Sequence, residues 1–208
     1  MKLHNGTSPN GMRVTMFMQE KGIELPLNDI SIMHGDTKKT EFLARNSLGQ
    51  VPVLELDDGR YLTESIAICR YLESKYPGPA LFGESAEEQA FIEMWNRRME
   101  LWLMTTFGSI GEHEIPYFQY RVEQNSAFAA AQRKEAIKRL TWLDNELSDG
   151  RDFIVDNQFS VADITGAASL MIAQFVKLAI PDDLENVQRW AKTVMSRNSF
   201  QASLPKRQ

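Results

Sequence analysis

The sequence contains few of the residues that build disulfides, metal sites or membrane spans. Cys69 is the single cysteine among 208 residues, so an internal disulfide is excluded and a reducing compartment is favoured. The histidines His4, His34 and His113 show no metal-ligand spacing, so we expect no metal. No apolar run approaches the ~18 residues that a membrane span needs, and the opening MKLHNG has no apolar stretch typical of a secretory signal. These absences predict a cytoplasmic protein without a membrane partner.

An excess of basic residues is also missing. The chain has 23 Lys and Arg against 28 Asp and Glu, a formal net charge of −5 and a pI near 5.3. Nucleic-acid-binding domains show a basic face instead, and the basic stretch RKEAIKRL at 133–140 is typical of a solvated helix face. The sequence therefore predicts no nucleic-acid partner.

The first 76 residues alternate short strand-like and helical segments. The patterns predict helices at 10–22, 38–46 and 64–76. Strands are predicted at 1–5, 25–32, 51–56 and 60–63, and the DDG between the last two favours a hairpin. The order βαβ, helix, ββα predicts a small α/β domain.

The rest of the chain is predicted to be helical. The stretch PGPALFGES at 77–85 has two prolines and two glycines, a density that excludes regular structure and indicates a linker. Helical spacing follows at 86–111, 126–147, 159–176 and 184–197. We therefore expect an α/β domain at 1–76, a linker at 77–85 and an all-α domain at 86–208.

A polar turn lies between the first strand and the first helix, in the stretch NGTSPNGMRV at 5–14. It brings Thr7, Ser8 and Asn10 to a helix N-terminus, where backbone N–H groups are unsatisfied and the helix dipole is positive. The cluster is typical of a capped turn. It is also the chemistry of an anion site, so both interpretations stay open.

Two other short segments open predicted elements. Gln50, Val51 and Pro52 open a strand, where proline is tolerated because it cannot donate to the ladder. A cis Val51–Pro52 bond would leave the Val51 backbone groups for a ligand. Glu64 and Ser65 open a helix, either as ordinary caps or as a site for a carboxylate and an ammonium.

The stretch FSVADI at 159–164 is interpreted as structural. Ser160 and Asp163 have capping-box spacing with Asp in place of Glu, and Phe159 and Ile164 occupy the hydrophobic staple positions.

Taken in order, the segments SPNGMRV, EKGI, EFLARNSLGQVPVLELDDG, LTESIAICRYL and FSVADI resemble the cytosolic glutathione S-transferase family over essentially the whole chain, in a bacterial-type variant with an SPNG turn. The resemblance implies a thioredoxin-like domain that binds glutathione, followed by an all-helical domain that lines the electrophile site. It further implies a homodimer that acts in detoxification, with glutathione as co-substrate and no cofactor.

The resemblance assigns glutathione to residues from three segments: Lys38, Gln50, Val51, Pro52, Glu64 and Ser65. It implies that the glutathione backbone pairs with Val51 and that Glu64 and Ser65 bind the γ-glutamyl end. Gln50 contacts the same tripeptide. Lys38 is the match for the glycyl carboxylate, with Thr37 at the preceding position where relatives often carry His.

The chemistry of such a site is the stabilisation of a thiolate. A thiol with a pKa of about 8.5 is mostly protonated at neutral pH, and a hydrogen-bond donor at a helix N-terminus lowers that pKa. Classes of the family use Tyr, Ser, Cys, or Thr and Asn as the donor, and here Ser8 is the first candidate, followed by Asn10 and Thr7. Cys69 is interpreted as a core residue of a sheet-packing helix, which disfavours a thiol-transfer enzyme that acts through it.

An apolar electrophile is expected at the boundary of the two domains, where ligand pockets often lie. The candidates share helical spacing or lie just after it: Met99, Trp102, Leu103, Thr106, Phe107, His113, Tyr117 and Phe118. Such a stripe belongs to a helical core more often than to a pocket. The sequence thus predicts a glutathione transferase for an apolar electrophile, with a glutathione-dependent disulfide reductase and a non-catalytic glutathione-binding or regulatory protein as the alternatives.

Overall fold

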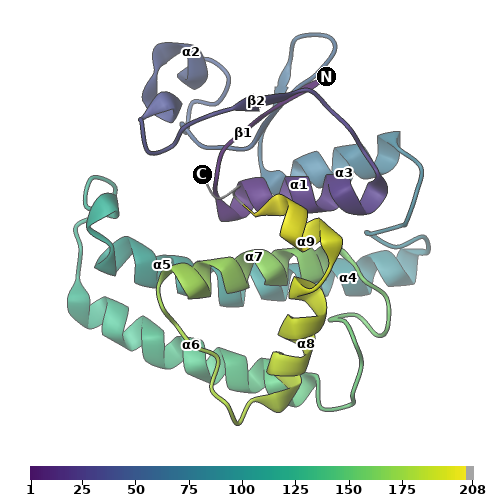
Figure 1. Ribbon diagram of the computed structural model, residues 1–208, viewed down its shortest axis with the longest axis vertical. Coiled ribbons are helices and arrows are strands. Elements are labelled where there is room, and N and C mark those ends of the chain that lie inside the picture. Colours follow the sequence, from purple (N-terminus) through teal and green to yellow (C-terminus); the bar gives the residue numbers. More distant parts are fainter. Residues whose placement is uncertain (205–208) are drawn as a thin grey trace. The chain divides into compact units, whose positions relative to one another are not determined.

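The computed structural model describes residues 1–204, which form two compact units (Figure 1). The first contains residues 1–80 together with the helix that begins at Asn198, and the second contains residues 81–197. The boundary lies inside the stretch 77–85 that the proline and glycine content marks as a linker. Within residues 1–204, every helix is too short or too polar to cross a bilayer.

The first unit is built on a sheet of four strands in the order β2-β1-β3-β4. The strands are β1 (Lys2–Asn5), β2 (Leu27–Asp29), β3 (Val53–Glu55) and β4 (Tyr61–Leu62). β1 is parallel to β2 and antiparallel to β3, and β3 is antiparallel to β4. The strand predicted at 25–32 is shorter than expected, because the N–H of Ser31 donates to the Asp36 carboxylate at 3.0 Å and the chain turns there.

The helices α1 (Pro9–Lys21) and α3 (Ser65–Lys75) pack against each other, and in Figure 1 they lie together below the strands. α1 ends at Gly22, whose φ of 64° suits a glycine. The helix predicted at 38–46 is instead divided into η1 (Asp36–Lys38) and α2 (Thr40–Leu43). The reason is Lys39, which adopts an extended backbone between them.

A further helix of this unit, α9 (Asn198–Ser203), follows the last helix that the sequence predicts. It packs against α1, with Phe200 buried and the Ser199 hydroxyl donating to the Glu20 carboxylate. The predicted second domain extended to residue 208, whereas this segment packs in the first unit. Six residues are too few to show a helical period, so the pattern alone does not reveal α9.

The second unit is helical throughout its regular elements. These are α4 (Ala86–Arg98), η2 (Met99–Met104), α5 (Thr105–Glu114), η3 (Pro116–Phe118), α6 (Ser126–Glu146), α7 (Val161–Phe175) and α8 (Glu185–Met195). α7 is the most apolar of them and is buried along most of its length, so it forms the centre of this unit.

The helix predicted at 86–111 contains a π-helical segment, η2, between α4 and α5. Its widened turn is seen where the Thr105 N–H donates to the carbonyl of Glu100, five residues earlier. The carbonyl of Trp102 accepts a hydrogen bond of 2.7 Å from the Arg139 guanidinium of α6. A contact from another helix therefore supports this irregular turn.

The predicted capping box at the start of α7 is confirmed. The Ser160 hydroxyl caps the first turn, and Asp163 accepts from the Ser160 N–H at 3.1 Å. Asp163 also accepts from the Ile154 N–H and from Trp190 Nε1, each at 2.9 Å. Complete burial nevertheless raises the pKa of Asp163 to about 6, while these hydrogen bonds oppose the rise.

Candidate functional site

Three of the predicted site segments meet at one edge of the sheet. β1 and β3 are antiparallel with His4 opposite Val53, so the turn that follows β1 lies beside the residues that precede β3. β3 and β4 are also antiparallel, so the residues that follow β4 reach the same edge. The strand register alone therefore brings Ser8, Val51 and Glu64 into one region of the first unit.

The N-terminus of α1 shows that the capped-turn interpretation is correct. Ser8 is the N-cap, and its Oγ accepts from the Gly11 N–H at 2.9 Å. Because this contact uses the hydroxyl as an acceptor, its own proton stays available for a ligand. Ser8 is half-buried, whereas Thr7 is exposed. A cap and an anion donor are thus compatible at Ser8.

Asn10 connects the N-termini of two helices. Its Oδ1 lies 3.2 Å from Arg13 Nη1, one turn later on α1, and 3.5 Å from the Ser65 hydroxyl at the start of α3. Arg13 and Ser65 are both buried. The sequence analysis did not identify Arg13 as a site residue, although its i, i+3 spacing from Asn10 places the two side chains on one face of α1.

Glu64 has a backbone conformation that is rare for any residue with a side chain. Its φ is 65° and its ψ is 113°, and its side chain makes no capping hydrogen bond to α3. Ordinary capping by Glu64 is therefore not what the structure shows. Such conformations cost ~1–3 kcal/mol and persist at functional sites, where the surrounding structure enforces them.

The Val51–Pro52 peptide bond is cis, the isomer that the family resemblance implies. Val51 precedes the ladder of β3, which pairs with β1 from Val53 onward, and its side chain is buried in the cluster that contains Ile30. The carbonyl of the preceding Gln50 accepts from Asn46 Nδ2 at 2.8 Å. Asn46, which the sequence analysis did not single out, therefore fixes the loop that leads into Val51.

Lys38 lies against this same loop. A β-carbon added to Gly49, whose φ is 61°, would come within 3.2 Å of Lys38 Nζ and 2.8 Å of the Thr37 carbonyl. Glycine at this position therefore permits the close approach of η1 to the loop before β3. The result is an exposed lysine, Lys38, whose ammonium lies close to Gly49, the residue before Gln50.

The candidates for the electrophile site differ in their exposure. Met99, Leu103 and Phe107 are fully buried in the helical unit, which is the arrangement that the core interpretation predicts. Thr106 is also buried, and its hydroxyl accepts from Arg139. Trp102, in contrast, is 47% exposed. In the second unit, Trp102 is therefore the most accessible apolar member of this stripe.

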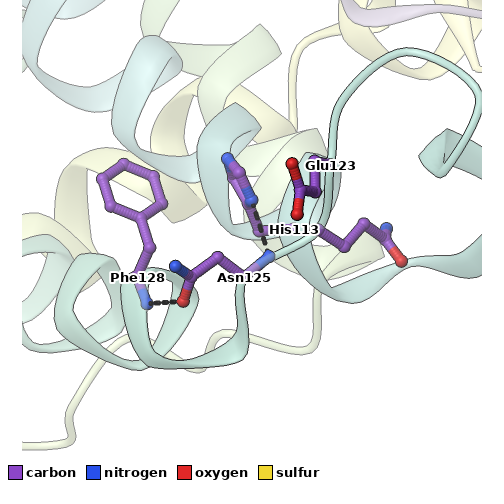
Figure 2. A pocket seen from close by; sticks show the side chains of 5 residues that line it. His113, Glu123, Asn125 and Phe128 are labelled. Atoms are coloured by element: carbon purple, nitrogen blue, oxygen red, sulfur yellow. Dashed lines mark hydrogen bonds between the residues drawn. The ribbon is translucent and has the colours of Figure 1, made fainter.

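His113 lies in a separate pocket of about 470 Å³ near the start of α6 (Figure 2). Its Nδ1 accepts from the Asn125 N–H at 3.1 Å. Its ring packs edge-on against the Phe128 ring, with 4.8 Å between the ring centroids. Glu123 and Gln124 also line this pocket. Tyr117 and Phe118 belong to η3, and their rings pack edge-on with 5.2 Å between the centroids.

Cys69 is fully buried in α3, and burial raises the pKa of its thiol to about 12, against the opposing charge of Arg13. A thiol in this state is neither accessible nor ionised at neutral pH. The structure thus agrees with the core interpretation of Cys69.

Comparisons with known proteins agree with this geometry. The family model described as glutathione S-transferase, N-terminal domain, matches residues 7–75, and the corresponding C-terminal domain matches residues 98–198. Glutathione S-transferase 2 of Saccharomyces cerevisiae is 35% identical over 200 residues, which cover 94% of this chain and 85% of the relative. The crystal structure of Gtt2 from the same yeast has a TM-score of 0.89 at 33% identity and covers 98% of this chain and 100% of that one. A glutathione S-transferase domain-containing protein of Marinobacter aquaeolei VT8 has the same TM-score and identity, covering 96% and 100%. The chain belongs to the glutathione S-transferase family and is a glutathione transferase.

Proposed function

We propose that the first unit binds glutathione at the edge of its sheet, holds it as a thiolate at the N-terminus of α1, and presents it to an apolar electrophile. The observation that carries this proposal is the convergence of Ser8, Val51 and Glu64 at that edge. Two helix N-termini and an unpaired strand entrance lie there together. Glutathione has a carboxylate and a thiolate for the two helix N-termini and a peptide backbone for the strand entrance.

The γ-glutamyl end is assigned to the start of α3. Its carboxylate is suited to the Ser65 hydroxyl and to the positive end of the helix dipole. Its ammonium is suited to the exposed carboxylate of Glu64. The strained backbone of Glu64 supports this assignment, because nothing in the local helix start requires it.

The rest of the tripeptide is assigned to the strand entrance. The Val51 backbone pairs with the peptide in an antiparallel manner, as an added strand would. Gln50 contacts the same peptide, and the Lys38 ammonium, which lies close to Gly49, binds the glycyl carboxylate. The close approach of Lys38 to the loop at Gly49 supports this arrangement.

The sulfur is assigned to the first turn of α1. Ser8 is our first candidate for the donor, with Asn10 and Thr7 after it. A donor and the helix dipole both favour the anion and therefore lower the pKa of the thiol. The thiol proton passes to solvent, the sulfur forms a bond to the electrophilic carbon, and the leaving group departs with its electron pair.

The exposed ring of Trp102 is our first candidate contact for the electrophile, followed by His113, which lines the pocket near the start of α6. The alternative of a disulfide reductase uses the same glutathione site and differs in the second substrate. We further propose, on the family resemblance, that the protein is a cytoplasmic homodimer that acts in detoxification, with glutathione as co-substrate and no cofactor.

Calorimetry with glutathione, followed by turnover with a haloaromatic electrophile and with a glutathionylated disulfide, tests the proposal. Ser65→Ala should weaken glutathione binding by ten-fold or more, because it removes a partner of a charged group. Glu24→Ala, an exposed carboxylate after the end of α1, is the matched control and should bind normally. Wild-type affinity in Ser65→Ala would contradict the γ-glutamyl assignment. Faster turnover of the disulfide would favour the reductase.

A further inference from the structure

The amide of Asn10 has an orientation that its neighbours determine. Its Oδ1 is 3.2 Å from Arg13 Nη1 and 3.5 Å from Ser65 Oγ. A guanidinium has donors and no acceptor, so the amide atom that faces Arg13 is the oxygen. The Nδ2 group lies on the other side of the same planar amide. It is therefore turned away from both Arg13 and Ser65, with its two N–H donors.

Loss of the hydrogen bond between Arg13 and the Asn10 oxygen would be costly, because Arg13 is buried. Only 2% of its surface is exposed, although it carries a full charge. A buried charge is costly unless hydrogen-bond partners compensate it. Rotation of the Asn10 amide would replace an acceptor of Arg13 with a second donor. The buried guanidinium thus opposes the flipped orientation more strongly than a solvated one would.

Ser65 is the weaker of the two partners. A separation of 3.5 Å is at the outer limit of a hydrogen bond. In the proposed complex the Ser65 hydroxyl also turns to the γ-glutamyl carboxylate. Arg13 is then the group that continues to hold the Asn10 oxygen while the thiolate forms.

We infer that Arg13 is a positioning residue that keeps the Asn10 amide turned so that Nδ2 donates to the glutathione sulfur. The inference rests on the proposed function and assigns Arg13 an action through Asn10, without contact to glutathione. An amide that is not held presents its oxygen to the sulfur part of the time. That oxygen carries a partial negative charge and opposes the thiolate.

The test is a double-mutant cycle on the pKa of the bound thiol, followed by the ultraviolet absorbance of the thiolate across pH. Asn10→Ala should raise that pKa by about one unit, a ten-fold loss of thiolate at a fixed pH below it. Arg13→Gln should raise it to a similar extent. In the Asn10→Ala background, Arg13→Gln should change that pKa by less than about 0.3 units, which is less than two-fold in the ratio of thiolate to thiol, because the group through which Arg13 acts is gone.

Two further variants separate this role from others. Arg13→Lys keeps the charge and loses the planar fork, so it should also raise the thiol pKa. Thr15→Val is the matched control, since the Thr15 hydroxyl donates to the Gly11 and Met12 carbonyls in the same helix. It should leave the thiol pKa unchanged. If Arg13→Gln does not fold, Arg13→Lys takes its place in the cycle.

The outcomes are distinct. Equal effects of Arg13→Gln with and without Asn10, together with wild-type behaviour of Arg13→Lys, would mean that Arg13 acts by its charge, and the inference would fail. A normal thiolate in Asn10→Ala would also overturn it while leaving Ser8 as the donor. If the wild-type protein binds no glutathione, the proposed function itself fails.

Discussion

Replacement of Glu64 by glycine should make the protein more stable and less able to bind glutathione. The reason is the backbone of Glu64, with φ at 65° and ψ at 113°. Glycine adopts positive φ without steric cost, whereas a residue with a β-carbon does not. The substitution therefore relieves strain and removes a ligand group in a single change.

The size of the stability gain follows from two opposing terms. Residues held in sparsely populated conformations cost ~1–3 kcal/mol. Glycine loses more conformational freedom on folding than glutamate does, which reduces the gain in the free energy of unfolding by ~0.5–1 kcal/mol. The net gain is about 1 kcal/mol, or ~2–4 °C in melting temperature for a protein of this size. Loss of the Glu64 carboxylate should weaken the binding of glutathione by about ten-fold. The effect is no larger because the exposed position of this carboxylate reduces its contribution to binding.

Thermal unfolding and glutathione calorimetry on the same samples measure both effects. Lys177→Gly is the matched control, because Lys177 also has a positive φ, 54°, and is exposed in the second unit. It should gain stability and keep its glutathione affinity. Glu64→Gln keeps the backbone strain and removes the charge, so it should lose affinity without a gain in stability. A lower melting temperature for Glu64→Gly, or wild-type affinity in that variant, would refute the reasoning.

Substitutions at four other residues test separate features. Burial raises the pKa of Asp163 from 3.8 to about 6, so the folded state binds the proton of this carboxyl more tightly than the unfolded state does. Its contribution to the free energy of unfolding should therefore fall by ~3 kcal/mol as pH rises from about 4 to 6. Denaturant unfolding of Asp163→Asn across this pH range should lack that fall, and a pH slope equal to that of the wild type would contradict the reasoning. Gly166→Ala should lose ~1–3 kcal/mol in thermal unfolding, because a β-carbon there would lie 2.6 Å from the Trp190 ring; normal melting would exclude the clash. Ser8→Ala should lose ~1 kcal/mol of capping and Ser8→Gly only a few tenths, while both raise the pKa of bound glutathione's thiol; a normal thiol titration in both would remove Ser8 as the donor. Cys69→Ser should leave turnover near wild type, and a large loss in a folded variant would give the thiol a role in the reaction.

The elements that the sequence predicts well are those whose signals are local. α1 was predicted within a residue of its bounds, because Val14 and Phe17 mark its buried face and Gly22 ends it. The π-helical segment could not be predicted in this way. The spacing of Met99, Leu103 and Phe107 suits one long helix, and the support for its irregular turn comes from Arg139 on another helix.

The same distinction applies to the candidate site. Family motifs identify Ser8 and Val51 as candidates, and the strand register then explains why they meet. Arg13 is different, because an arginine in an apolar helix is ordinarily solvated. Its burial and its contact with Asn10 depend on how α1 packs in three dimensions. The spacing of the pair was visible in the sequence, but its meaning was not.

The helix α9 determines when the first unit can be completed. This unit combines residues 1–80 with a helix that begins at Asn198, and Phe200 is buried in it. A ribosome makes the chain from the N-terminus at ~5–20 residues per second. The surface of α1 that receives α9 therefore lacks this partner for the whole time in which residues 81–197 are made. During synthesis, the helical unit has all of its residues before the first unit does, even though the first unit begins the chain.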